Sequence, residues 1–341
     1  NFLNNLKHLQ KLVLRSCKFK YTPEFKQPHN QLKYLDLHNC RLIISDAEMF
    51  AGLKCLAFLD LAENDVGNVF PELFRELKQL EVLKLRTSIS DKLIKLRVNN
   101  AFTHLSNLRE LHCGAFEFEG RTLFSPLKSL QKLTIEGSKL RKSTIDSIPR
   151  VRELRFSDNS CIFIDKTMFS KKHPNLESLD LSRMNLAKVN QHIDVKAFSG
   201  LKSLKSLNLA YNRINFINEK MLINLESLES LDLSVSQRTF VIELNSSTLK
   251  SMKNLKVLKL KANILRLHGD CFKPLVQLRE LDLSDVKMKS SRDIDVFKYL
   301  QGIEKLNLKN LAANFQLKIY KLAKLIHLKE LCLNIQSDEV Q

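Results

Sequence analysis

The sequence lacks several features that mark other classes of protein. It has no tryptophan, and its 341 residues include only 8 glycines and 7 prolines. This scarcity argues against flexible linkers and low-complexity segments. No apolar run approaches the roughly 18 residues that a membrane-spanning helix needs, and no secretory signal sequence stands at Asn1.

Motifs of catalysis and of metal binding are missing as well. The chain contains no H-E-x-x-H, G-x-S-x-G or G-x-G-x-x-G motif. Its seven cysteines include no C-x-x-C pair, which argues against a zinc site. Asp36 and Asp60 could mimic a carboxylate dyad, but on an exposed sheet we expect them to be solvated or paired with basic neighbours. We therefore expect a non-enzymatic protein without catalytic residues, metal or cofactor.

The sequence does contain a recurring leucine frame, Leu-x-x-Leu-x-Leu-x-x-x-x-Leu. A frame that recurs at a spacing in the twenties is typical of a leucine-rich-repeat solenoid. We predict an α/β fold in which residues 1–341 form a single array of about fourteen repeats, curved like a horseshoe, with a parallel sheet on the concave face. The copies lie 21 to 28 residues apart and start at Leu9, Leu32, Leu56, Leu80, Leu108, Leu130, Val151, Leu176, Leu204, Leu228, Leu255, Leu278, Ile303 and Leu328.

Each repeat predicts one short strand and one return segment. In the third copy, Leu59 and Leu61 alternate with Phe58, Asp60 and Ala62, and this period of two indicates a strand with one buried face. The return carries the pattern Phe-x-x-Leu, and its phenylalanines should stack as a buried spine rather than as a binding stripe. These are Phe50, Phe74, Phe102, Phe124, Phe198, Phe272 and Phe297.

The ninth frame position predicts the turn after each strand. Asparagine at this position satisfies backbone groups of the turn, and it occurs at Asn64, Asn159, Asn212 and Asn263. Cys17 and Cys40 fill the position in two neighbouring repeats, where we interpret them as reduced substitutes for asparagine.

Three repeats are longer than the rest, with insertions near residues 86–101, 186–197 and 238–250. Insertions of this kind map to loops on one face, which is often a binding face. The last insertion contains Asn245-Ser246-Ser247, the only N-x-S/T sequon of the chain. Asn245 is therefore the candidate glycosylation site.

The charge is unevenly distributed. Of 55 basic and 37 acidic residues, the outward strand positions carry 18 and 17, so the predicted concave face is almost neutral. A polyanion such as a nucleic acid or a glycan could bind a basic flank by counterion release, although solubility alone also explains exposed charges. This flank, where the chain leaves each strand, carries Lys18, Lys20, Arg41, Lys92, Lys139, Arg141, Lys142, Lys188, Arg213, Arg266, Lys287 and Lys289.

Two patches stand out on the predicted concave face. Tyr34, Phe58 and Val82 share one outward position in three successive repeats, and an exposed apolar row suits a protein or lipid contact. The second patch is a group of lysines on a later strand with a nearby tyrosine, and it comprises Lys256, Lys259, Lys261 and Tyr211. Either patch could be incidental.

The units LKSLNLAYNRINFINEKMLINL and LAFLDLAENDVGNVFPELFREL, with their Phe-x-x-Leu returns and irregular lengths, resemble those of Toll-like receptor ectodomains. The resemblance implies an innate immune receptor that binds a protein or microbial ligand on its lateral and concave surfaces and signals as a homo- or heterodimer. It also implies an extracellular location, at the cell surface or in the endosomal lumen, within a single-pass membrane receptor.

Neither end of the array shows a covering element, so we expect a piece of a longer receptor, truncated at both ends, whose membrane segment lies outside this sequence. Two alternatives stay open. One is an extracellular adhesion or protein-binding scaffold. The other is an intracellular leucine-rich-repeat inhibitor or adaptor, which seven cysteines in the reduced state would suit.

Overall fold

The structure is a computed structural model of the chain. It forms two compact units, Asn1–Cys161 and Ile162–Gln341. The residues that it describes are 5–29, 31–66, 71–87, 94–96, 101–118, 121–161, 164–165, 168–169, 173–184, 193–212, 214, 217, 219–235, 241–288, 296–311 and 319–334.

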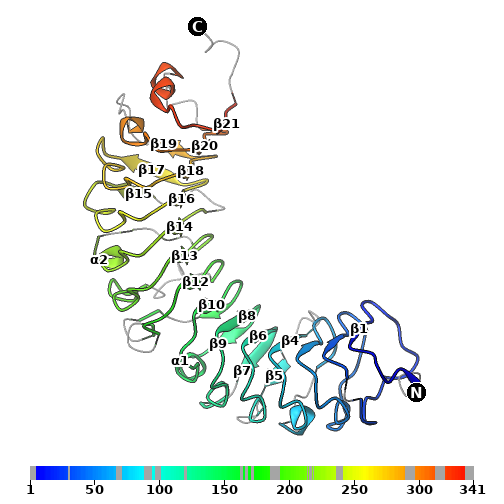
Figure 1. Cartoon of the computed structure of the whole chain (residues 1–341). Coiled ribbons are helices and arrows are strands. Elements are labelled where there is room, and N and C mark those ends of the chain that lie inside the picture. The colour runs from blue at the N-terminus through cyan, green and yellow to red at the C-terminus, as the bar shows by residue number, and fades with distance from the viewer. Residues whose placement is uncertain are drawn as a thin grey trace. The chain divides into compact units, whose positions relative to one another are not determined.

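The N-terminal unit contains a main sheet of parallel strands, one from each repeat (Figure 1). Neighbouring strands pair in register, so that Lys11, Tyr34, Phe58 and Val82 lie side by side in one row. The strands are β1 (Lys11–Val13), β2 (Tyr34–Asp36), β3 (Phe58–Asp60), β4 (Val82–Arg86), β6 (Glu110–Gly114), β8 (Lys132–Glu136) and β10 (Glu153–Arg155).

The second unit repeats this arrangement. Its main-sheet strands are again parallel and in register. They are β12 (Ser178–Asp180), β13 (Ser206–Asn208), β14 (Ser230–Asp232), β16 (Val257–Lys259), β18 (Glu280–Asp282), β20 (Lys305–Asn307) and β21 (Glu330–Cys332).

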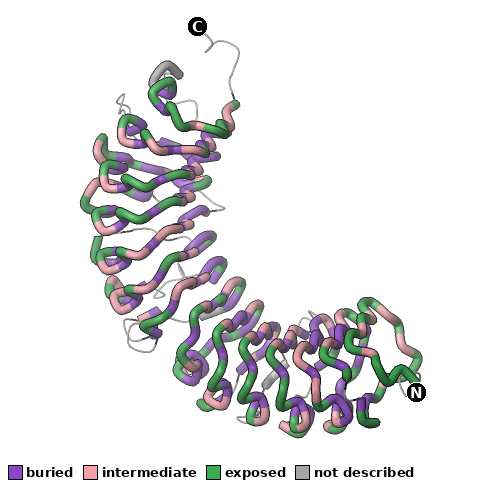
Figure 2. The backbone as a smooth tube through the Cα atoms, in the orientation of Figure 1, coloured by how far each residue is buried: buried purple, intermediate pink, exposed green. Residues whose placement is uncertain are grey.

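The leucine frame places every one of these strands. Each begins at the third position of its frame, two residues after the first leucine. The inward residues are then the fourth and sixth, and Leu59 and Leu61 are fully buried as predicted. Figure 2 shows the resulting alternation of buried and less buried backbone along the stacked repeats. The prediction of a leucine-rich-repeat solenoid is therefore confirmed.

The return segments supply the rest of the core. All seven spine phenylalanines are at most 2% exposed, which confirms a packing role, and the rings of Phe102 and Phe124 stack 6.0 Å apart. Regular structure in these segments is short. It comprises the 3-10 helices η2 (Pro71–Phe74), η3 (Phe297–Tyr299) and η4 (Ile319–Lys324) and the α-helices α1 (Lys142–Asp146) and α2 (Glu219–Leu222).

Two smaller parallel sheets form where the chain leaves the main strands. They correct the expectation that the insertions are loops, because β5 and β15 lie inside two of them. Residues 186–192 of the third insertion are outside the described part. The N-terminal unit contains β5 (Ile94–Leu96), β7 (Phe116–Phe118), β9 (Lys139–Leu140) and β11 (Ser160–Cys161), and the other unit contains β15 (Val241–Leu244), β17 (Ile264–Leu267) and β19 (Lys287–Met288).

The turn after each strand has the predicted chemistry. The buried Asn64 side chain bonds to backbone groups of its own repeat and of the preceding one. In the preceding repeat the Cys40 thiol donates to the carbonyl of Leu14 at 2.7 Å, which is the role that asparagine has elsewhere. Burial raises the pKa of Cys40, so this thiol stays protonated and able to donate.

None of the helices in the described part of the chain is long and apolar enough to cross a membrane.

Candidate ligand-binding surface

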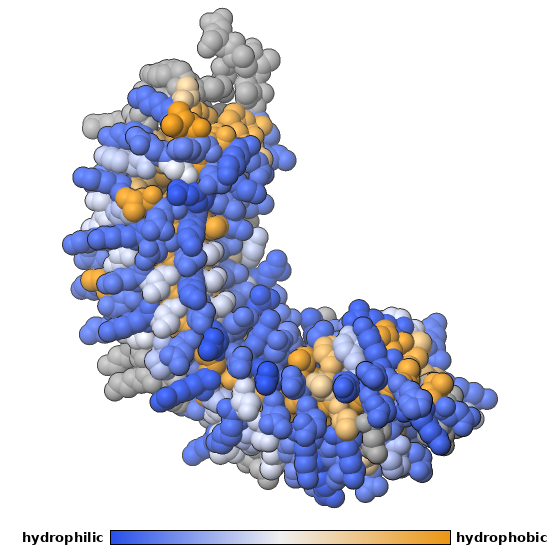
Figure 3. All heavy atoms as spheres, viewed as in Figure 1, coloured by the Kyte–Doolittle hydropathy of each residue, from blue (hydrophilic) through white to orange (hydrophobic). Residues whose placement is uncertain are grey.

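The most distinctive surface feature is an aromatic pair on the main sheet of the N-terminal unit. Tyr34 on β2 and Phe58 on β3 are cross-strand partners, and their rings stack with centroids 4.1 Å apart and planes inclined by 4°. Both are half-buried, as is Val82 beside them on β4. Figure 3 shows apolar side chains interrupting the hydrophilic surface of this unit. The row that the sequence predicted is thus present.

Two lysines complete the pair. The ammonium group of Lys11, on β1, lies 4.6 Å from the centre of the Tyr34 ring, and that of Lys84, on β4, lies 5.4 Å from the centre of the Phe58 ring. Such contacts attract a cation to the face of an aromatic ring. We call Lys11, Tyr34, Phe58 and Lys84 the aromatic–lysine stack. The sequence did not single out its lysines, although Lys11 occupies the same frame position as the two rings.

The carboxylates beneath the stack are not solvated. Asp36 and Asp60 are only 1% and 2% exposed. Asp36 accepts hydrogen bonds from Arg15 at 2.5 Å and from the backbone N–H of His38, and the bond to Asp36 raises the pKa of Arg15. Asp60 lies 3.3 Å from the ammonium group of Lys84. The expected pairing with basic neighbours is confirmed, but the alternative of solvated carboxylates is wrong, because the cations cover them.

The later lysine patch is present, but its charges are compensated. Lys256 lies 2.8 Å from Glu229, and its hydrogen bond lowers the pKa of that carboxyl. Lys259 and Lys261 lie 3.9 and 3.8 Å from Glu280 and Asp285 on the neighbouring repeat.

Tyr211, the aromatic member of the later patch, is 37% exposed, and the Arg183 guanidinium stacks 4.9 Å from its ring centre. The later patch therefore offers a potential ligand little uncompensated positive charge or open ring face.

The basic flank is also partly neutralised. Lys139 and Arg141 both approach Glu117, at 3.6 and 3.0 Å. Arg266 shares Glu243 with a histidine. All described members of the flank are exposed, and besides these three they are Lys18, Lys20, Arg41, Lys142 and Lys287. Lys92, Lys188, Arg213 and Lys289 lie outside the described residues.

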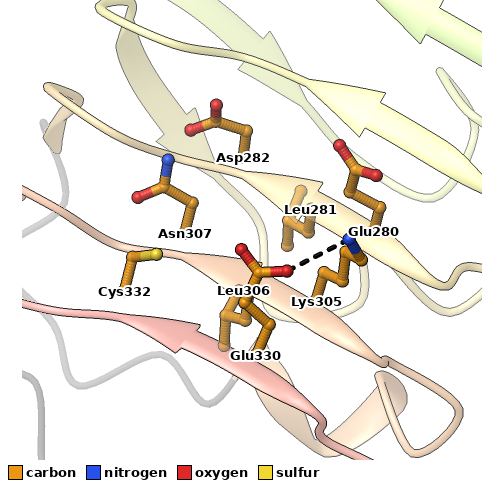
Figure 4. A pocket seen from close by; sticks show the side chains of 8 residues that line it. All are labelled: Glu280, Leu281, Asp282, Lys305, Leu306, Asn307, Glu330 and Cys332. Atoms are coloured by element: carbon orange, nitrogen blue, oxygen red, sulfur yellow. Dashed lines mark ion pairs between the residues drawn. The ribbon is translucent and has the colours of Figure 1, made fainter.

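The second unit also has a polar hollow that its sequence did not predict. It measures about 150 Å³ and is lined by side chains of β18, β20 and β21 (Figure 4). Asp282, Asn307 and Cys332 line one side, and the ion pair between Lys305 and Glu330, 3.1 Å apart, lines the other. No cluster of three or more metal-binding side chains occurs in the described ranges.

The sequon lies at an accessible turn after β15. The side-chain oxygen of Asn245 accepts hydrogen bonds from the Ser247 hydroxyl and from the backbone N–H of Thr248, both at 2.9 Å. These bonds orient the amide oxygen toward the turn. Attachment of a glycan to the amide nitrogen would leave all of them intact.

Comparisons with known proteins agree with this architecture. Leucine-rich-repeat family models match residues 174–237 and 31–53. Human Toll-like receptor 3 is 27% identical over 184 residues, 51% of this chain and 20% of the receptor. The solved Toll–Spatzle complex of Drosophila aligns with a TM-score of 0.71 and 20% identity, over 97% of this chain and 46% of that chain. The TLR13–ssRNA13 complex aligns with a TM-score of 0.69 and 23% identity, over 98% and 55%.

The comparisons confirm the leucine-rich-repeat fold and the resemblance to Toll-like receptor ectodomains. The chain spans only 15 to 43% of the curated relatives that it matches.

Proposed function

We propose that this leucine-rich-repeat chain, similar to Toll-like receptor ectodomains, is the non-enzymatic ligand-recognition part of an extracellular innate immune receptor. Ligand would bind mainly on the main-sheet face of the N-terminal unit, and the bound receptor would dimerise to signal. The similarity to Toll-like receptor 3 supports the class of protein. An adhesion scaffold with the same fold remains the second candidate, because it would use the same open sheet.

The observation that carries the proposal is the aromatic–lysine stack. Aromatic side chains are enriched at binding hot spots, and two of them held together on an open sheet lose little conformational freedom when a partner covers them. The stack is already assembled by strand register. The later lysine patch is a weaker candidate because its three lysines already face carboxylates, and the basic flank is partly neutralised by Glu117 and Glu243.

Phe58→Glu is expected to weaken ligand binding at least about tenfold, because it places a charge in the apolar centre of the contact. The stacked pair contributes at most about 1 kcal/mol to folding, so the melting temperature should change little. Interferometry with immobilised wild type and variant would measure binding of three probes, namely an acidic peptide, a single-stranded RNA oligonucleotide and heparin. If no probe distinguishes the two proteins, the main-sheet face is not the binding site.

Charge reversal of Lys139, Arg141 and Lys142 tests the proposed secondary role of the flank. We expect heparin affinity to fall and the slope of log K against log salt to decrease by about 2, because these cations would no longer release counterions. Lys256→Glu is a matched control from the later lysine patch. An unchanged affinity and salt slope would rule out the flank as a polyanion site.

An extracellular location predicts a glycan at Asn245. In secretory expression in eukaryotic cells, the chain should gain the mass of one N-linked glycan that a peptide N-glycosidase removes. Asn245→Gln should abolish the mass shift, whereas Asn254→Gln, at an exposed asparagine outside a sequon, should retain it. A secreted protein without the shift would contradict this part of the proposal.

A further inference from the structure

The geometry of the aromatic–lysine stack restricts the chemistry of its ligand. The two rings face each other at 4.1 Å. The outer face of Tyr34 is covered by Lys11 and that of Phe58 by Lys84. All four ring faces are therefore occupied within the sheet, and the stack presents ring edges and ammonium groups outward.

This arrangement is poorly suited to nucleic acid. Proteins that bind single strands stack each base on the open face of an aromatic ring. A base could use Tyr34 or Phe58 only after displacing a lysine from the ring or separating the rings. Ring edges carry the positive end of the aromatic quadrupole, so together with the ammonium groups they favour an anion that approaches in the plane of the rings.

The surroundings also favour an acidic group with an apolar neighbour. The buried carboxylates of Asp36 and Asp60 offset the charges of Arg15 and Lys84, so the uncompensated positive charge of the stack is that of Lys11. Arg15, above Asp36, is 55% exposed. Lys11 forms no ion pair with any described residue. Val13, 47% exposed on β1, adds apolar surface next to this positive rim.

We propose that the aromatic–lysine stack recognises an acidic segment of a protein ligand, in which a carboxylate contacts Lys11 and an adjacent apolar side chain covers the ring edges. The inference rests on the proposed function and specifies its ligand class. Charge complementarity selects the partner, and the closed ring faces select a peptide over a single-stranded nucleic acid.

The test uses four proteins and three probes. The proteins are the wild type, Lys11→Met, Phe58→Leu and the control Lys132→Met. Methionine keeps the aliphatic length of lysine and removes its charge. Lys132 occupies the same frame position as Lys11 but pairs with Glu153 outside the stack. The probes are an Asp/Glu-rich peptide with a central leucine, the same peptide with Asn/Gln in place of the acids, and an oligouridine of equal charge.

The acidic peptide should bind the wild type about tenfold more tightly than the amide peptide does. Its affinity should fall about five- to tenfold in Lys11→Met and in Phe58→Leu, the usual range for loss of one charge or one ring at a contact. Lys132→Met should bind like the wild type.

Three outcomes would overturn the inference. Equal binding of the acidic and amide peptides would show that carboxylates are not recognised. Tighter binding of oligouridine, lost in Phe58→Leu, would identify nucleic acid as the ligand and leave the proposed receptor function standing. If neither Phe58→Leu nor Phe58→Glu changes the binding of any probe, the aromatic–lysine stack is not a binding site, and the proposed function is contradicted as well.

Discussion

Asn64→Ala is expected to lower the free energy of unfolding by about 3–5 kcal/mol, since each buried polar group left without a partner costs about 1–3 kcal/mol. The side chain is 1% exposed. Its oxygen accepts from the backbone N–H groups of Cys40 and Leu42 at 2.9 and 3.0 Å. Its nitrogen donates to the carbonyls of Leu37 and Leu61 at 2.8 and 3.0 Å. The alanine variant leaves all four backbone groups buried without these partners.

Denaturant titration of the variant and of two controls would measure this effect. Asn107→Ala removes one hydrogen bond from an exposed side chain and should cost less than about 1 kcal/mol. Asn64→Ser should fall between the two, because Ser138 fills the equivalent position and still bonds to the backbone of its neighbour. Equal losses for Asn64→Ala and Asn107→Ala would contradict the structural role of the ninth frame position.

Gly52→Ala is expected to destabilise the N-terminal unit by about 2–4 kcal/mol. An added Cβ atom would lie 2.0 Å from the carbonyl oxygen of Gln27 and 2.6 Å from that of Phe25. Both are backbone atoms, and Gly52 is hydrogen-bonded to the same segment through Phe25 and His29. The segment must move, because no side chain can rotate to relieve the contact.

Gly137→Ala is the matched control for this steric effect. Its added Cβ would meet no atom closer than 4.0 Å, but its φ is +58°. The cost there is the left-handed conformation alone, about 1–2 kcal/mol. Comparing the two melting curves separates steric exclusion from backbone strain. A larger loss at Gly137 than at Gly52 would show that the chain at Gln27 does not pack as described.

The sequence predicts the main architecture because the spacing of the leucine frame along the chain determines it. Strand starts, buried leucines such as Leu59 and the phenylalanine spine all follow from the frame. The substitution of Cys40 for asparagine was also predictable, because Cys40 occupies the ninth frame position, which lies in the turn after the strand. Local period and burial are sufficient for these features, and no long-range contact has to be known.

Features that depend on contacts between repeats were not predictable in the same way. The small sheet containing β15 and β17 depends on the pairing of an insertion with the next repeat. The number of charged residues at the outward strand positions predicted a nearly neutral sheet. It did not show that Lys256 forms an ion pair with Glu229, or that Asp36 is buried under Arg15. Such pairings depend on the rotamers of long side chains, which a repeat frame does not specify.

The candidate site illustrates the same division. The frame identified Tyr34 and Phe58, because both occupy its third position on successive strands. It did not show that their rings close on each other or that Lys11 and Lys84 cover the outer faces. Those contacts restrict the protein or lipid contact that the sequence predicted to a ligand that approaches the ring edges.

The central claim is that a carboxylate of the ligand contacts Lys11 of the aromatic–lysine stack, and zero-length carbodiimide coupling tests it most directly. The reagent joins a carboxylate to an amine only when the two are in contact. After coupling to the acidic peptide, mass spectrometry should locate the new amide bonds at Lys11, well above Lys132. Bonds spread evenly over the lysines, or concentrated at Lys139 and Lys142 on the basic flank, would contradict the claim.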